Sequence, residues 1–376
     1  MSLFAHVGSL LGTLIPFLFV LTIVVFFHEM GHFLVGRWCG VKVDAFSLGF
    51  GPELFARTDR KGTRWRIAAV PLGGYVKFHG DINAASAQSE ALVSELPPEE
   101  RKVTFAAQPV ASRAAIVAAG PIANFLLAIV ILTATFYIDG KPVLTPRIEN
   151  VVAGSAADRA GFMPGDLIVA IDSTPIDSFS DMQRIVGASG DVPLTFKVQR
   201  GSSEVALNAT PERKDVVGPF GTTRLGVLGV GTSSKPGDFR TDRLTLPQSV
   251  ATAAGEIWFV VDRTGSYVGG LFMGRESAAQ LSGPIRIAEV SGAVAKLGIG
   301  ALLNWAAFLS ISIGLINLVP VPLLDGGHLL YFAFEAIRGR PLSERAQEFG
   351  FKVGLAFVSL LMIFATYNDL ARPMHP

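Results

Sequence analysis

Four apolar runs without charged residues constrain this chain more than any other feature of its sequence. They extend over Val7 to Phe27, Ala114 to Ile138, Leu297 to Leu324 and, in a shorter run, Val353 to Tyr367. Because about 20 apolar residues cross the hydrocarbon core of a bilayer, the first three runs are long enough to span, and the fourth can span with its flanking residues. We therefore expect a polytopic α-helical membrane protein with about four transmembrane helices.

The composition agrees with this expectation and excludes several classes of protein. Only 17% of the residues are charged, against about 25% in soluble domains. The net charge of +1 gives no reason to expect nucleic acid as a partner. Since Cys39 is the one cysteine, an internal disulfide and a cysteine-rich metal site are both excluded, and any metal must be bound by histidine and carboxylate.

The first two runs also indicate how the chain is oriented. A cleavable signal peptide is the alternative for Val7 to Phe27, but no basic residue precedes this run and it leads directly into His28, so we expect it to be retained. Basic residues are concentrated between the first and second runs, which predicts that this segment is cytoplasmic. The N-terminus, the C-terminus and the long middle segment are then expected on the opposite side of the membrane.

Residues 139–212 are expected to form a small β-rich domain. Leu167 to Ile171 is a short apolar run after a glycine-rich turn, and Leu194, Phe196 and Val198 alternate with polar residues, as in half-buried strands. Ser180 and Gln183 have the spacing of a capping box and predict a helix start between these strands.

Residues Ser155 to Asp172, with their Gly-Phe-Met-Pro-Gly-Asp turn, resemble PDZ domains of the bacterial protease-associated type. The resemblance implies a domain that binds an extended chain by strand addition, and the alternative is a β-sandwich spacer that binds nothing. Residues Pro211 to Pro236 are predicted to be a linker. Leu246 to Met273 is apolar but contains Glu256, Asp262 and Arg263, which favours an interfacial amphipathic helix or a buried strut over a full crossing.

The sequence His28-Glu29-Met30-Gly31-His32 is a His-Glu-x-x-His motif at the cytoplasmic end of the first span. On a helix the i, i+4 spacing places both imidazoles on one face, where they can bind one Zn²⁺, and Glu29 beside them can act as general base. Ionisable residues in a span are costly, so a functional role is favoured over capping of the helix. A soluble metzincin is excluded, because Trp38 stands where its third histidine would be.

A third metal ligand is expected near the end of the third run. Two prolines and two glycines in Asn317 to His328 predict that the helix breaks there, inside protein or beside a water-filled cavity. Asp325 is the favoured ligand because a carboxylate at this depth needs a cation. His328 is the competing ligand, and it can instead be a supporting or interfacial residue. His6, His79 and His375 are interpreted as ordinary polar positions.

Three motifs around the PDZ-like domain resemble the site-2 protease family of intramembrane zinc metalloproteases. They are the His-Glu-x-x-His motif, Gly120-Pro121-Ile122-Ala123-Asn124, and Asn317 to Gly327 with Leu324-Asp325-Gly326-Gly327. The similarity extends over essentially the whole chain and is strongest to the bacterial regulator-of-sigma-E protease type. It implies His28, His32 and Asp325 as zinc ligands and Glu29 as the catalytic base. Some members have two tandem PDZ domains, whereas the space in this chain fits one.

The resemblance also implies roles for two asparagines and for a cytoplasmic segment. Asn124 and Asn317 are expected to hold the substrate backbone near the metal, although an amide in a span more commonly joins helices. Val41 to Phe46 and Arg66 to Phe78 resemble the family's membrane-associated β-hairpin, which can hold an unwound substrate by strand addition; the alternative is an ordinary cytosolic hairpin. Asp81 to Arg101 is expected to be a solvated linker.

Together these observations predict four segments and one activity. The segments are residues 1–138 with two spans and the hairpin, 139–212 with an extracytoplasmic PDZ domain, 213–296 with a linker and interfacial helix, and 297–376 with two spans and the third ligand. The expected activity is zinc-dependent cleavage of transmembrane segments, in substrates such as anti-sigma factors or remnant signal peptides, in the bacterial inner membrane. The alternatives are a PDZ membrane adaptor with a structural zinc site closed by His328, and a zinc transporter.

Overall fold

The computed structural model describes residues 3–81, 96–218, 221–232, 239–274, 278 and 281–371. The chain forms two compact units. The first contains residues 1–135, 250–262 and 281–376, and the second contains residues 136–249 and 263–280.

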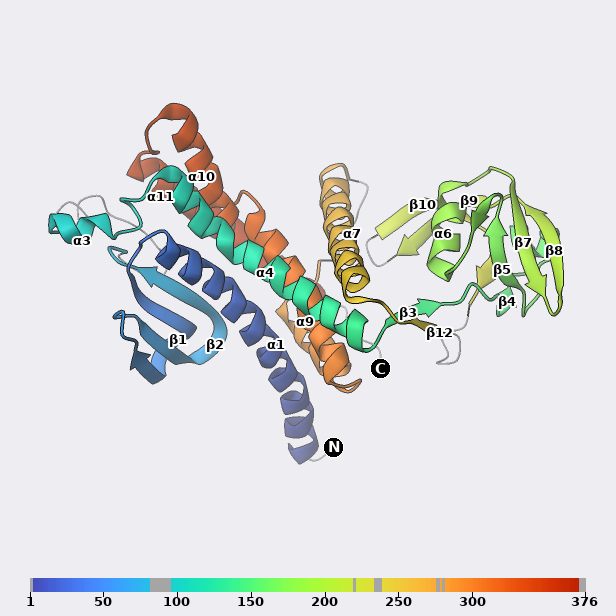
Figure 1. Ribbon diagram of the computed structural model, residues 1–376, viewed down its shortest axis with the longest axis horizontal. Coiled ribbons are helices and arrows are strands. Elements are labelled where there is room, and N and C mark those ends of the chain that lie inside the picture. Colours follow the sequence, from blue (N-terminus) through green and yellow to red (C-terminus); the bar gives the residue numbers. More distant parts are fainter. Residues whose placement is uncertain are drawn as a thin grey trace. The chain divides into compact units, whose positions relative to one another are not determined.

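The first unit is mainly helical (Figure 1). Its elements are α1 (Leu3–Trp38), β1 (Val43–Thr58), β2 (Arg64–Phe78), α3 (Pro98–Lys102), α4 (Val110–Ile138), α8 (Pro284–Ala295), α9 (Ile299–Leu318), α10 (Asp325–Arg338) and α11 (Glu344–Ala371). Helix α7 (Leu246–Phe272) contributes its middle part to this unit. Four helices in the described part of the chain are long and apolar enough to cross a membrane, within α1, α4, α9 and α11, and this agrees with the predicted number of spans.

The core of the first unit is formed where α1 meets the other spans and the hairpin. Val20 and Val24 of α1 are fully buried against Leu302 and Ala306 of α9. At its other end, α1 packs through Phe33 against an aromatic cluster that includes Phe46 of β1. This packing gives the second half of α1 fixed neighbours on several sides.

The hairpin of β1 and β2 is confirmed as a pair of antiparallel strands, and it is much longer than predicted. Ser47 to Thr58, which completes β1, was not predicted as strand because its glycines and proline interrupt the strand pattern. Repeated shifts in the pairing register, beginning near Val43, bend the two strands, and Figure 1 shows the curved pair beside α1. Most of the predicted linker from Asp81 to Arg101 lies outside the described residues, and its last part belongs to α3.

The second unit is a small β-rich domain, as expected. Its elements are β3 (Lys141–Leu144), β4 (Asn150–Val151), α5 (Ala156–Ala160), β5 (Leu167–Ile171), β6 (Thr174–Pro175), α6 (Phe179–Ala188), β7 (Leu194–Arg200), β8 (Ser203–Ala209), β9 (Glu212–Gly218), β10 (Gly221–Val227), β11 (Val230–Gly231) and β12 (Phe239–Asp242). A four-stranded sheet has the order β6-β5-β7-β8. The predicted alternation in β7 is confirmed, since Leu194, Phe196 and Val198 are buried in the core.

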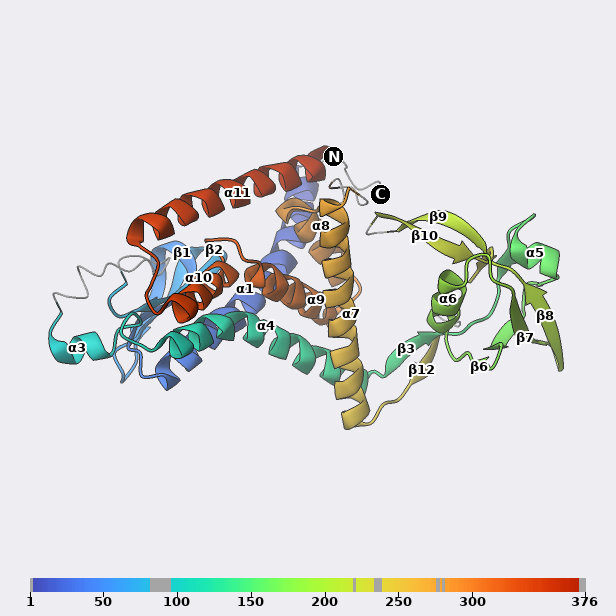
Figure 2. The same cartoon turned by 90° about the horizontal axis from the view of Figure 1, so that it is seen from above.

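Two predictions for this unit were wrong. The segment from Pro211 to Pro236 is not a linker in its described part, because β9 pairs with β10, and β11 pairs with β4. Helix α6 begins at Phe179, and its cap is Ser178, two residues before the predicted cap, since Ser178 accepts a hydrogen bond from the backbone N–H of Asp181. Figure 2 shows α6 next to the strands of this unit.

Candidate metal centre

Helix α1 continues without interruption through the His-Glu-x-x-His motif to Trp38. Because the helix is regular at this point, His28 and His32 lie on the same face, one turn apart, as the spacing predicted. Their Nε2 atoms are 3.2 Å apart. The two imidazoles therefore present their outer nitrogens to one point.

Asp325 comes to the same point from a broken helix. Helix α9 ends at Leu318, the segment with Pro320 and Pro322 is not helical, and α10 begins at Asp325 itself. The predicted break is thus confirmed. The Oδ2 atom of Asp325 lies 3.2 Å from the Nε2 atom of His28 and 3.6 Å from that of His32.

These three side chains fit a zinc ion. Their ligand atoms lie within 4.8 Å of one another. In a tetrahedral site with bonds of about 2.1 Å, neighbouring ligand atoms are about 3.4 Å apart, which matches the three separations observed. The buried Oδ2 atom of Asp325 accepts no hydrogen bond from the described residues and faces the Nε2 atoms of the two imidazoles, a position in which a metal would compensate its charge. Two histidines and one carboxylate are also a common donor set for catalytic zinc.

His328 lies close to this cluster but is not part of it. Among the described residues, the group that can hold a metal consists of His28, His32 and Asp325. His328 is near enough to interact electrostatically with Asp325 and His32, and its ring packs edge to face with Tyr331. The geometry therefore favours Asp325 as the third ligand, and it gives His328 a neighbouring position.

Helix α4 forms one wall of the site. The carbonyl oxygen of Ile116 is 2.9 Å from Nδ1 of His32, and the side-chain nitrogen of Asn124 is 3.2 Å from Nδ1 of His28. Gly120 lies between them, and a methyl group there would overlap Nε2 of His32 and lie 2.9 Å from Cε1 of His28. These three residues are spaced by four, so they form one stripe on α4 that faces the imidazoles.

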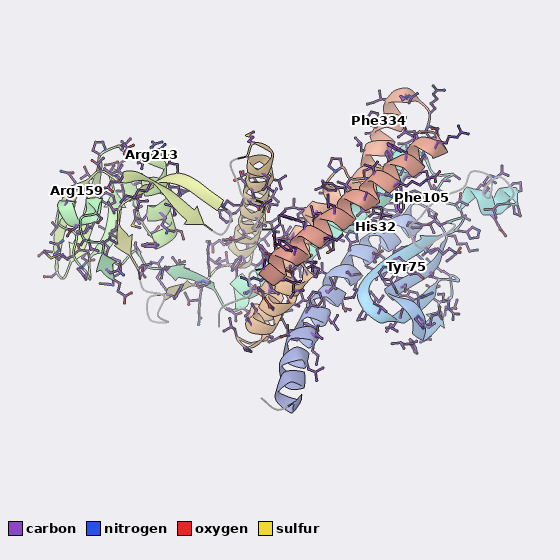
Figure 3. The ribbon with its side chains drawn as sticks, turned by 180° about the vertical axis from the view of Figure 1, so that it is seen from behind. His32, Tyr75, Phe105, Arg159, Arg213 and Phe334 are labelled. Atoms are coloured by element: carbon purple, nitrogen blue, oxygen red, sulfur yellow. The ribbon has the colours of Figure 1, made fainter. Side chains whose placement is uncertain are left out.

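Strand β2 forms a second wall, against Glu29. The backbone N–H of Val76 donates a hydrogen bond to the Glu29 carboxylate, which also interacts electrostatically with His32 and Asp325. A methyl group at Gly74 would lie 3.1 Å from Cγ of Glu29 and 2.8 Å from the carbonyl oxygen of Ser47. Figure 3 shows His32 on α1 near the part of the hairpin that carries Tyr75.

A polar cluster fixes the hairpin to the end of α1. Arg37 donates hydrogen bonds to the Oδ2 atom of Asp59 at 2.6 Å and to the hydroxyl of Thr63 at 2.8 Å. Desolvation acts in the opposite direction, but the bonds from Arg37, Trp65 and the backbone hold the pKa of Asp59 well below its usual range. Asp59 therefore stays ionised, and the ion pair holds the hairpin beside the helix that carries Glu29.

A second ion pair holds the helix that carries Asp325. Arg113 of α4 donates a hydrogen bond to Glu335 of α10 at 2.6 Å, and both side chains are largely buried. The guanidinium also lies 5.1 Å from the centre of the Phe332 ring. Because Arg113 lies on the same helix as Gly120 and Asn124, this contact ties Asp325 to the wall that faces the histidines.

The remaining predicted residues have other positions. Asn317 lies in the last turn of α9, partly buried, just before the helix break. His79 is not an isolated polar residue, since its Nδ1 atom lies 3.1 Å from Asp44. The side chain of His6 and all of His375 lie outside the described residues.

The family model described as Peptidase family M50 matches residues 16–361, which includes all three residues of the metal cluster. The chain belongs to peptidase family M50. This is the site-2 protease family of zinc metalloproteases, so the chain is a zinc-dependent protease, and the non-catalytic adaptor that the sequence had left open is set aside.

M50 relatives match nearly the whole chain. A protein of Rhizobium meliloti, named as a candidate zinc metalloprotease, is 49% identical over 95% of this chain and 96% of its own length. A similarly named protein of Agrobacterium fabrum is 47% identical over 98% of both chains. Metalloprotease MmpA of Caulobacter vibrioides is 40% identical over 96% of this chain and 95% of its own. With four apolar helices, this M50 protease is a multi-pass membrane protein.

Proposed function

We propose that this protease cleaves transmembrane segments of other membrane proteins, inside the bilayer and near its cytoplasmic face. The observation that carries the proposal is the position of the cluster. His28, Glu29 and His32 lie in the part of α1 that is long and apolar enough to cross a membrane, and Asp325 is contributed by the chain that follows α9, another such helix. A catalytic site on such elements is suited to a substrate that is itself in the membrane.

The proposed ligands are His28, His32 and Asp325. When bound, zinc supplies a Lewis acid that polarises the scissile carbonyl and lowers the pKa of a water molecule. Glu29 would serve as the proton carrier, accepting a proton from the attacking water and donating it to the leaving amine. The hydrogen bond from the Val76 N–H is proposed to orient the Glu29 carboxylate.

The hairpin and two asparagines are proposed to hold the substrate. A transmembrane substrate is helical, and its backbone must be unwound before hydrolysis, so a nearby strand edge can bind it by strand addition. Strand β2 pairs with β1 and with no other strand of the described chain. Asn317, in the last turn of α9, and Asn124 of α4 are proposed to bind the substrate backbone through their amides.

The hairpin is also proposed to lie against the membrane. Large apolar side chains are exposed on it, at Phe50, Leu54, Phe55, Ile67, Val70 and Leu72. Exposed apolar side chains in one contiguous element mark an interaction surface. The same reasoning supports the interfacial position of α7, on which Trp258 and Phe259 are largely exposed.

The proposed location is the bacterial cytoplasmic membrane, with the hairpin segment in the cytoplasm. Eleven arginine and lysine residues between the first two spans support this orientation by the positive-inside rule: Arg37, Lys42, Arg57, Arg60, Lys61, Arg64, Arg66, Lys77, Arg101, Lys102 and Arg113. The β-rich unit is then extracytoplasmic. We propose that it is a PDZ domain that either excludes substrates with a bulky extracytoplasmic domain or binds a newly exposed chain end.

The proposed substrates are single-span membrane proteins, such as anti-sigma factors or remnant signal peptides. The test uses purified protein in lipid vesicles with a single-span substrate that lacks its extracytoplasmic domain. Wild type is expected to cut within the span, as mass spectrometry of the products would show, and Glu29→Gln is expected to keep its zinc without cutting. Glu289→Gln, at a partly exposed position of α8, is the control and should cut normally.

Two results would contradict the proposal. Cleavage confined to the soluble flanks of every substrate would exclude intramembrane cleavage. Undiminished cutting by Glu29→Gln would exclude Glu29 as the general base.

A further inference from the structure

The tautomer of each histidine in the metal cluster is set by what its inner ring nitrogen contacts. A neutral imidazole carries one proton, so it can bind a metal through Nε2 only when that proton is on Nδ1. His32 meets this condition, because its Nδ1 lies 2.9 Å from the carbonyl oxygen of Ile116, which can only accept a hydrogen bond. His28 needs an acceptor in the corresponding position.

Among the described residues, the side chain at that position is Asn124. Its amide nitrogen is 3.2 Å from Nδ1 of His28, while its buried oxygen, Oδ1, has no hydrogen-bond partner in the described part of the chain. In this orientation the amide would donate to Nδ1, and the ring proton would be on Nε2, directed at Asp325 and His32. That tautomer blocks metal binding at the atom closest to the other two ligands.

Rotating the side-chain amide of Asn124 by 180° gives its Oδ1 atom a hydrogen-bond donor and leaves Nε2 of His28 free to bind the metal. The oxygen and nitrogen of an asparagine amide occupy nearly the same volume, and the hydrogen-bond network decides between the two orientations. With Oδ1 toward His28, the Nδ1–H group has an acceptor and Nε2 has a free lone pair.

We propose that Asn124 is a positioning residue for zinc: its side-chain oxygen accepts the Nδ1–H of His28 and fixes the tautomer that leaves Nε2 free to bind the metal. This rests on the proposed assignment of His28 as a zinc ligand. Asn124 is fully buried, which keeps water from competing for this bond. Helix α4 thus supplies an acceptor to both histidines, from Ile116 and Asn124, and Gly120 between them leaves room for the rings.

The test compares two substitutions of similar size in the full-length protein. Asn124→Asp keeps an acceptor and removes the donor, whereas Asn124→Leu removes both. Zinc affinity is measured by competition with a chelator. Asn124→Leu should bind zinc about 10 to 100 times more weakly than wild type, and Asn124→Asp should stay within about threefold of wild type or bind more tightly.

Two further variants serve as controls. Ser310→Ala removes the hydroxyl that donates to the backbone carbonyl of Asn124 at 2.8 Å without touching the imidazole, so its zinc affinity should match wild type. His28→Ala should lose zinc binding. Full zinc affinity in His28→Ala would contradict the proposed ligand set. Loss of zinc in His28→Ala together with normal zinc binding in Asn124→Leu would contradict only the role of Asn124. Equal weakening by Asn124→Asp and Asn124→Leu would also overturn that role, because it would mean that the amide acts as a donor.

A second measurement uses wild type, so it does not depend on whether a variant folds. In ¹⁵N-histidine-labelled wild-type protein, the resonances of the zinc-bound imidazoles are identified as those that shift when zinc is removed. We expect the proton on Nδ1 of His28. A proton on Nε2 would overturn the proposal.

Discussion

Asp166 and Asp325 are two aspartates withdrawn from water in different units of the molecule, and their partners differ in kind. The Asp166 side chain is 1% exposed and receives two hydrogen bonds from Arg200, each 2.8 Å long, and a third from the backbone N–H of Met163. The Asp325 side chain is 18% exposed and faces two imidazoles, and its Oδ2 atom accepts no hydrogen bond from the described residues.

The difference shows how a structural carboxylate can be distinguished from a metal-binding one. A buried charge is costly unless a counter-charge and hydrogen bonds compensate for it. In the β-rich domain the protein supplies the cation itself, as Arg200. At Asp325 the neighbouring groups are ligand atoms for a metal, so the compensating cation there is expected to be zinc.

The largest expected effect comes from Asp325→Asn. The amide lacks the charge that binds zinc, so affinity should fall by at least about 100-fold, which is more than loss of a supporting residue causes. Zinc content and cleavage should be lost together. Asp166→Asn is the matched control, and it should keep its zinc. Equal zinc content in the two variants would contradict the conclusion that Asp325, and not Asp166, is a metal-binding carboxylate.

Gly120→Ala should have the next largest effect. The added methyl group would overlap His32 and force the imidazoles away from Asp325. We expect zinc affinity to fall about 10- to 100-fold, as measured by chelator competition. Gly12→Ala, at a helical position where no described atom lies within 4 Å, should bind zinc normally. Unchanged affinity in Gly120→Ala would show that α4 does not confine the histidines.

Gly74→Ala is expected to affect the catalytic base, Glu29, without affecting zinc binding. The three atoms nearest to its methyl group would belong to the Ser47 carbonyl, the Val25 side chain and Glu29, and none of them to a histidine. A small displacement of a catalytic group costs about 10- to 100-fold in rate, so kcat should fall by this factor while zinc content stays the same. Gly187→Ala in α6, where the new atom makes an ordinary contact, is the control. Loss of zinc in Gly74→Ala would contradict the separate roles of the two walls.

Arg200→Leu should have the smallest effect on the metal site and a local effect on the β-rich domain. Leaving Asp166 buried without its donor should destabilise this domain by about 1 to 3 kcal/mol, with zinc content unchanged. Proteolysis of the full-length protein at increasing urea concentrations measures this loss.

The pH dependence of the stability of the β-rich domain follows from the contact between Asp166 and Arg200. Hydrogen bonding to Arg200 lowers the pKa of Asp166, so its contribution to stability is complete at neutral pH and is lost as the pH falls below about 4, toward the lowered folded value. Arg200→Leu should reduce this acid sensitivity. If the wild-type domain were equally stable at pH 3 and pH 7, the ion pair would not be what stabilises it.

The sequence predicted the spans, the imidazole pair and the break before Asp325, because each depends on local spacing or on proline. Spacing alone favoured Asp325 over His328 without deciding between them, because order along the chain does not tell which side chain reaches α1, and the family resemblance then implied Asp325. Ile116, Gly120, Gly74 and Val76 were not predicted to have a role, because their contacts join residues far apart in the sequence. The glycines inside otherwise regular patterns, Gly73-Gly74 and Gly120-Pro121, were the available signals of close approach.

The strands β9 to β11 were missed for a different reason. Glu212 to Asp215 are all charged, so the segment lacks the alternation that marks a half-buried strand. The burial of Leu228 and the pairing of Val230 with Val151 become visible only in the folded domain.

The most direct test of Asp325 as the third zinc ligand is X-ray absorption spectroscopy at the zinc edge on zinc-loaded wild-type protein and Asp325→Asn. We predict a four-coordinate zinc in wild type with two imidazoles and oxygen donors, and loss of this signal in Asp325→Asn. A wild-type zinc with three imidazoles, unchanged in Asp325→Asn, would show that His328 is the third ligand, and it would contradict the assignment of Asp325.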